Sequence, residues 1–208
     1  MSADDRRPMA YPPLSPPVMF DRPRSEWSRS DGKAVLDWLV SLVTPRTDEL
    51  LARLDMSWAD RPAGWLRLVE VGIRERIWTN DLWQPGNGPE TIELRGRTIE
   101  QDLGPQLSGL GEALGVDLGL LLARSFVGHL GDDARWIVGA HGRTYVSRML
   151  PVLVGRGAME FDPMLIGPNV ARGWLPGAEA GHHTPDLTTL HDRWLQMLSD
   201  PGAGRPRP

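Results

Sequence analysis

Three of the five histidines in this 208-residue chain lie close together, in the segment GHHTPDLTTLHDRW from Gly181 to Trp194. Imidazole nitrogens and carboxylate oxygens are zinc ligands, so His182, His183 and His191 form a candidate metal site. With a nearby carboxylate they would be the site of a metal-dependent hydrolase. The alternative is that the segment is the ordinary start of a helix.

A helix start accounts for most of this segment. Thr184 is a good N-cap residue, Pro185 suits the first helical position, and Asp186 complements the helix dipole. Beyond them, apolar residues recur every three or four positions, as expected for one buried helical stripe. We therefore predict a C-terminal helix over residues 185–199.

The spacing of the histidines disfavours a metal site. His182 and His183 are neighbours, and neighbouring side chains of an extended segment point to opposite faces. His191 lies roughly 10 Å further along the helix axis, at about 1.5 Å per residue, and shares no helical face with Asp186. We therefore expect no metal and no cofactor, and keep the metal-dependent hydrolase as the alternative.

Two loops carry other candidate binding residues. Trp78 and Trp83 bracket a polar loop that could anchor a partner or stack on a small molecule, although such tryptophans more often close a core. His141 lies beside glycine in an expected turn between strands, where an exposed imidazole could serve a function. Histidine also tolerates the left-handed turn conformation better than most residues, which is the simpler explanation.

The composition excludes several classes of function. The net charge is −4 with basic and acidic residues interleaved, whereas nucleic-acid-binding proteins usually concentrate basic residues in a patch. The chain has no cysteine, which excludes disulfides, thiolate nucleophiles and cysteine-ligated zinc. No segment looks like a signal peptide or a membrane span of about 20 apolar residues. We expect a cytoplasmic protein that binds neither nucleic acid nor membrane.

Two biases in composition point to its origin and role. Lys33 is the only lysine, and alanine, glycine and proline are abundant, which is typical of a high-GC bacterial genome. The chain has 9 tryptophans, a high number. Tryptophan is enriched at the energetic centres of protein interfaces, so this number favours a protein-binding role.

Residues 1–29 are predicted to form an extended arm, because repeated prolines remove backbone donors and favour polyproline geometry. The arm is either a disordered leader or a segment that docks on its own domain, on a partner or on a second copy. It carries apolar residues that a solvated tail does not need: Tyr11, Val18, Met19 and Phe20. Residues 30–199 are expected to form one domain, with a flexible tail over 200–208.

Helical spacing dominates residues 30–130. A first helix, with Asp31 as candidate cap, is expected to end at Thr44–Pro45, where a second and shorter helix begins. A third helix follows Pro62 and runs to Ile77.

Two more helical patterns follow. Thr98 and Gln101 form a candidate capping box for a helical pattern that reaches Leu114, although the residues just before it are ambiguous between a strand and a helix lead-in. Asp117 is the candidate cap of the next helix, which ends near Gly131. The first part of the domain is thus expected to hold about four to five helices.

The pattern changes over residues 134–162. β-Branched and aromatic residues dominate there, and glycine-containing turns separate them, which predicts an antiparallel sheet of three to four strands. Helices, then a small sheet, then a C-terminal helix over 185–199 is a segregated order. Segregation of this kind predicts an α+β fold.

One segment carries a pattern found in other proteins. The helix LGLLLARSFVGHLG leads into Arg135 and Trp136 on an expected strand, and FDPMLIGPNVARGWL closes the unit. In this pattern, residues 118–174 resemble small uncharacterised bacterial α+β domains, several of which are similar to immunity or accessory proteins encoded beside toxins. Arg135 and Trp136 match the recurrent pair of such domains. The resemblance brings no catalytic residues.

These observations favour a non-enzymatic bacterial protein that acts by binding another protein. An immunity or accessory factor is the kind of protein we expect. The candidate contact residues are Trp78, Trp83, Arg135, Trp136 and His141. A metal-dependent hydrolase that uses the His182, His183 and His191 region is the alternative, and a small-molecule binder that uses the Trp78–Trp83 loop is a third hypothesis.

Overall fold

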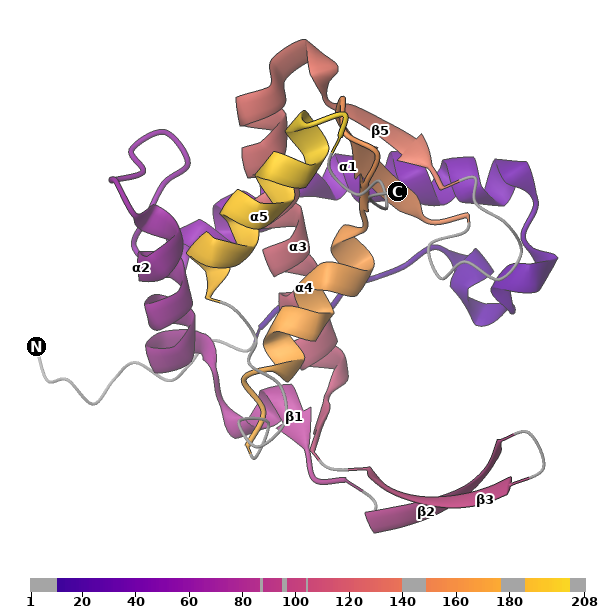
Figure 1. Ribbon diagram of the computed structural model, residues 1–208. Helices are drawn as coiled ribbons and strands as arrows, with labels where there is room; N and C mark the ends of the chain where they lie inside the picture. The colour runs from indigo at the N-terminus through magenta and orange to yellow at the C-terminus, as the bar shows by residue number, and fades with distance from the viewer. Residues whose placement is uncertain are drawn as a thin grey trace, which may run out of the picture.

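The computed structural model describes residues 11–86, 88–94, 97–103, 105–139, 149–176 and 186–202 (Figure 1), with residues 88–94 and 97–103 described by their backbone alone. The described helices are α1 (Arg29–Ala52), α2 (Trp65–Gly72), α3 (Gly109–Leu130), α4 (Pro163–Arg172) and α5 (Leu187–Ser199). The described strands are β1 (Trp83–Gln84), β2 (Gly88–Leu94), β3 (Arg97–Leu103), β4 (Gln106–Leu107), β5 (Arg135–Val138), β6 (Pro151–Val154) and β7 (Glu160–Phe161). The predicted α+β class is confirmed.

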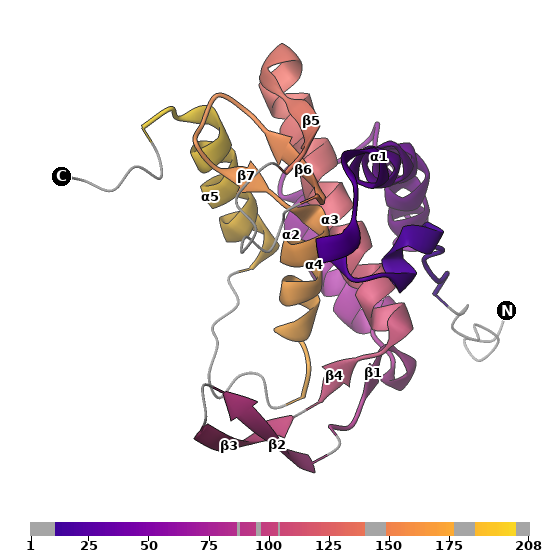
Figure 2. The same cartoon turned by 90° about the vertical axis from the view of Figure 1, so that its right-hand side faces the viewer.

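Helix α3 forms the centre of the molecule, with α1, α4 and α5 packed around it (Figures 1 and 2). Its N-cap is Ser108, whose hydroxyl oxygen accepts a hydrogen bond from the Gly111 N–H at 3.2 Å. Asp117 therefore lies inside the helix, and its prediction as a cap was wrong. By length and composition the stretch Gly109–Asp133 could cross a membrane, but most of it is buried within the body, as in the core helix of a soluble protein.

Glycines let α3 and α4 approach each other closely. A Cβ added at Gly119 would lie 2.1 Å from the carbonyl oxygen of Pro163, and one at Gly167 would lie 2.0 Å from the carbonyl oxygen of Gly115. No side chain fits at such distances, so these glycines are needed where the two backbones touch. The close approach fixes how α4 sits on the core.

Helix α1 is continuous, so the predicted break at Thr44–Pro45 was wrong. Its N-cap is Ser28, which forms a capping box with Asp31 at the third helical position. Proline inside a helix costs one backbone hydrogen bond. Leu39 and Leu50, on either side of Pro45, are fully buried, and their burial holds both halves of the helix on the core.

A two-stranded ribbon occupies the first part of the region where a helix was predicted from Thr98 to Leu114, whereas Gly109–Leu114, the end of that region, are helical as the first turns of α3. Strands β2 and β3 pair antiparallel along 7 residues each. Ile99 and Leu103, which suggested a helix, are four positions apart, and a four-residue spacing fits the two-residue period of a strand as well as a helical face. The ribbon extends away from the body beyond the short β1–β4 pair (Figures 1 and 2).

The predicted antiparallel sheet is present as three strands in the order β5–β6–β7. Trp136 faces Leu153 across the first pair, and Leu153 faces Phe161 across the second. Leu153 and Phe161 are fully buried, so this sheet closes one side of the core.

The arm, from residue 11 to Ser28, lies against its own domain. Tyr11 joins the main core, while Trp27 is buried with Val35 and Leu150 in a second cluster that Phe20 also contacts. The rings of Phe20 and Trp27 meet edge to face at a centroid distance of 5.1 Å. The described part of the arm therefore contributes to the folded core.

Candidate functional site

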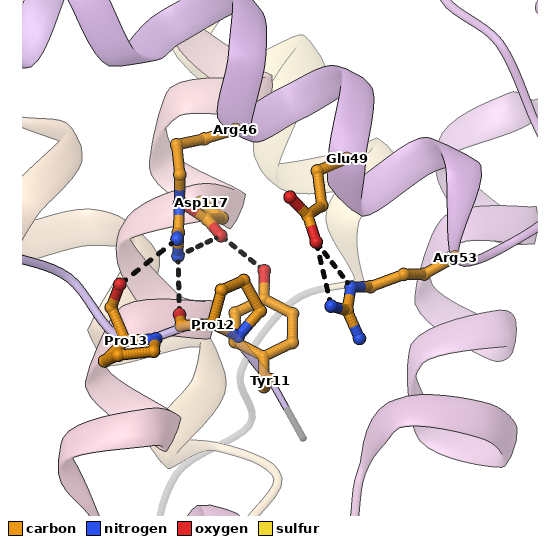
Figure 3. Close-up of polar contacts among 7 residues, drawn as sticks. All are labelled: Tyr11, Pro12, Pro13, Arg46, Glu49, Arg53 and Asp117. Carbon is orange, nitrogen blue, oxygen red and sulfur yellow. Dashed lines mark hydrogen bonds and ion pairs between the residues drawn. The ribbon is translucent and has the colours of Figure 1, made fainter. Parts of the chain in front are cut away.

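A buried polar cluster joins the arm to two helices. Asp117 on α3 accepts hydrogen bonds from Arg46 on α1, from Nε to Oδ1 at 2.8 Å and from Nη2 to Oδ2 at 2.7 Å. The Tyr11 hydroxyl donates to the same carboxylate (Figure 3). Arg46 also donates to the backbone carbonyls of Pro12 at 3.1 Å and Pro13 at 3.4 Å. The guanidinium therefore binds both the core carboxylate and the arm.

The three groups of this cluster are all largely buried. Asp117 is 1% exposed in the middle of α3, and Tyr11 is 5% exposed. Arg53 forms an ion pair with Glu49 at 2.8 Å. Its Cζ atom lies 5.4 Å from the centroid of the Tyr11 ring (Figure 3). A cation near the ring face adds attraction to the packing of the tyrosine.

Burial shifts the acidities in this cluster. It raises the pKa of Asp117 from 3.8 to about 6, although the hydrogen bonds from Arg46 and Tyr11 pull that pKa down. Burial, and next the nearby Asp117 carboxylate, raise the pKa of Tyr11 well above its usual value of 10. Tyr11 therefore stays protonated and donates its hydrogen bond at neutral pH.

The cluster works as a clamp. A shifted carboxyl beside a tyrosine could exchange protons with a substrate, but both groups are almost completely covered. Catalysis requires the reacting group to reach the substrate within hydrogen-bonding distance. The arrangement instead fastens the start of the described arm to α1 and α3.

Ser125, His191 and Asp192 form a second polar arrangement, with hydrogen bonds in the serine–histidine–aspartate order of a catalytic triad. The Ser125 hydroxyl lies 3.0 Å from Nε2 of His191, and Nδ1 of His191 lies 3.0 Å from Oδ1 of Asp192. The imidazole is stacked on Phe126 with a centroid distance of 5.1 Å. The residues come from α3 and α5, so the contact links two helices.

The exposures of these residues are the reverse of those in a serine hydrolase. A catalytic serine must be reachable and its aspartate buried beneath the histidine. Here Ser125 is 3% exposed, whereas the Asp192 side chain is 72% exposed. We therefore assign the Ser125–His191 contact to the packing of α5 on α3.

The tryptophans predicted as binding residues pack against the core. The Trp78 ring meets that of Trp174 edge to face at 5.6 Å between centroids. Trp83 on β1 faces Leu107 on β4, and its side chain is partly buried. The structure does not bring the two tryptophans into one contact, which agrees with the alternative that they close a core.

The two residues of the recurrent pair differ in exposure. Arg135 is exposed on β5, while Trp136, its neighbour, is partly buried against two core clusters. Arg135 is thus open to solvent and Trp136 anchors the strand on the core.

Part of the candidate metal site lies outside the described residues. His182 and His183 fall there, and so does His141. In the parts of the chain that the structure covers, no three histidine or acidic residues are grouped to hold a metal ion. Both ring nitrogens of His191 are already engaged, so a metal there would have to displace Ser125 or Asp192.

Sequence reasoning missed the clamp. Asp117 stands alone in the otherwise apolar run from Val116 to Leu122, and a lone carboxylate on a buried helix needs a buried partner. That signal was present in the sequence, but it could not identify Arg46 or Tyr11 as the partners.

Comparison with protein-family models, with curated protein sequences and with solved structures gives no match to this chain.

Proposed function

We propose that this chain is a non-enzymatic bacterial protein that acts in the cytoplasm by binding another protein, as an immunity or accessory factor does. The single observation that supports this most is the ribbon of β2 and β3. Each of its strands pairs with the other and with no further strand in the described parts of the chain.

The physical chemistry of such a ribbon favours a partner. A two-stranded ribbon alone is marginally stable in water. Its two outer edges present unpaired N–H and C=O groups, which a strand of another chain can pair with. With 7 residues in each strand, the ribbon offers an edge long enough to take up such a strand. The exposed Arg135 lies on another element and would add to a contact on the body.

The test removes the ribbon and leaves the body intact. Gln84 faces Gln106 across the β1–β4 pair, so residues 85–105 can be replaced by Asn-Gly, the preferred pair for a two-residue hairpin turn. A partner is first identified by pull-down from the source organism and then purified. Its affinity for the ribbonless variant should fall by at least about tenfold.

The matched control is Arg95→Asn, which alters the connection between β2 and β3 and keeps both strands. It should bind the partner like the wild type. If the purified partner binds the ribbonless variant with unchanged affinity, the ribbon is not its binding surface. If no specific partner exists, the proposed function is wrong.

A metal-dependent hydrolase that uses the His182, His183 and His191 region remains the alternative. Metal analysis of the purified chain decides between the two functions. A stoichiometric zinc, iron or manganese ion that is lost in His191→Ala would favour the hydrolase.

A further inference from the structure

A surface hollow of about 480 Å³ lies where α1 ends and the chain turns towards α2. It is formed by seven residues: Ala52, Asp55, Met56, Ser57, Asp60, Pro62 and Leu68. Neither the clamp nor the ribbon uses this part of the surface. Its lining combines apolar side chains with two carboxylates and contains no basic residue.

The apolar part of the hollow continues onto the outer side of α2. Leu68 is 51% exposed and Val71 is 41% exposed. They are three positions apart on the helix, so they share one face. Adjacent exposed aliphatic side chains beside a hollow are typical of a contact surface for another protein.

The acidic part of the hollow holds a carboxylate in a fixed position. The Ser57 hydroxyl donates to Oδ2 of Asp60 at 2.8 Å and accepts from the Asp60 N–H at 3.2 Å. Within the described residues Asp60 forms no ion pair. Asp55 pairs with Arg76 through Oδ2 at 2.7 Å, and the Asp55 side chain is nevertheless 79% exposed. A cationic group in the hollow would therefore meet one uncompensated carboxylate and one that is paired on a single side.

The loop that carries these residues is anchored to the core. The Cζ atom of Arg61 lies 3.5 Å from the ring centroid of Trp58, and that of Arg124 lies 4.1 Å from it. Because both guanidinium groups are so near the same ring, they must lie on its opposite faces. Arg124 belongs to α3 and also donates to the Thr47 hydroxyl at 2.6 Å. The hollow is thus formed before any ligand arrives, which lowers the entropy cost of binding.

We infer that this hollow is a docking site for a partner protein segment that presents an arginine or lysine next to an apolar residue. The cationic group lies against Asp60 and Asp55, and the apolar side chain lies on Leu68 and Val71. This inference rests on the proposed protein-binding function, but it uses a face of the molecule other than the ribbon.

The experiment is an NMR titration of the isotopically labelled full chain with two dipeptides, N-acetyl-Arg-Leu-amide and N-acetyl-Glu-Leu-amide. The arginyl peptide should shift the amide signals of residues 55–61 and 68–71, and the glutamyl peptide should not. Asp60→Asn should lower the affinity of the protein for the arginyl peptide by about fivefold, the size expected for the loss of one exposed ion pair. Asp37→Asn, at an exposed carboxylate on α1 outside the hollow, is the matched control and should bind like the wild type.

Equal shifts with both peptides, shifts confined to other residues, or an affinity that Asp60→Asn leaves unchanged would overturn the inference. The proposed function is tested separately by the ribbonless variant. If the purified partner needs the ribbon and the arginyl peptide shifts no signals, the proposed function stands and the docking site is wrong. A positive titration with a partner that binds equally well without the ribbon means that the docking site stands and that the ribbon is not the binding surface.

Discussion

Asp117 is the residue whose chemistry depends most on the rest of the fold. Its carboxylate is almost completely buried, and among the described residues its compensating charge is Arg46, which it meets through two hydrogen bonds. A buried charge of this kind is costly unless it is paired, so its protonation is linked to the stability of the whole molecule.

The contribution of Asp117 to the stability of the protein should therefore fall as the pH rises from about 4 to about 6. Burial raises the pKa of Asp117 from 3.8 to about 6, so in this range the folded chain keeps a proton that the unfolded chain has lost. The difference of about two pKa units corresponds to about 3 kcal/mol. Urea unfolding at several pH values, for the wild type and Asp117→Asn, measures it.

The comparison between the two proteins isolates the contribution of this group. Relative to Asp117→Asn, the wild type should lose about 3 kcal/mol between about pH 4 and about pH 7, because asparagine does not titrate. A difference in unfolding free energy that stays constant with pH would contradict the assignment of the pKa to Asp117.

At this scale the sequence predicted residue environments better than residue partners. It placed His191 beside a helical stripe, and His191 is indeed buried on α5, but its contact with Ser125 joins positions 66 apart. Tyr11 and Asp117 are 106 apart. No local spacing carries information on such pairs, because the packing of helices decides them.

At the scale of elements, the contact between α3 and α4 depends on backbone proximity. Gly119→Ala should destabilise the protein by about 3 kcal/mol or more, because the new methyl group would lie 2.1 Å from the Pro163 carbonyl oxygen and the helices must separate. Gly128→Ala on the same helix is the control. Nothing lies within 4 Å of a Cβ there, so it should stabilise the protein by up to about 1 kcal/mol. Urea midpoints compare the two, and equal effects would refute this packing.

The elements that the sequence predicted correctly are those whose local signals agree with their tertiary contacts. The helix predicted to Ile77 occurs as α2 followed by a π-helical turn, and the hairpin bend near Gly155 occurs between β6 and β7. Pro45 and Ile99 misled the prediction. The burial of the residues around Pro45 keeps α1 continuous in spite of the proline. The spacing of Ile99 and Leu103 fits a helix and a strand equally well, so the rest of the fold decides which one forms.

At the scale of the whole molecule, two extended segments have opposite relations to the core. The arm buries Tyr11 and Trp27 and supplies a partner to Asp117. The ribbon packs extensively against no other described element. One segment therefore belongs to the folding unit, and the other is free to serve a different purpose.

Removing each segment should separate stability from binding. A chain that starts at Ser28 keeps the cap of α1 but loses two buried aromatic side chains, so it should lose more than about 3 kcal/mol of unfolding free energy or fail to fold. Trp27→Ala in the full chain should lose about 3 kcal/mol by itself. The ribbonless variant should stay within about 1 kcal/mol of the wild type, because its removal uncovers little of the core. Urea unfolding of the three proteins gives the comparison. A ribbonless variant as unstable as the armless one would mean that the ribbon supports the core and is not free to serve a partner.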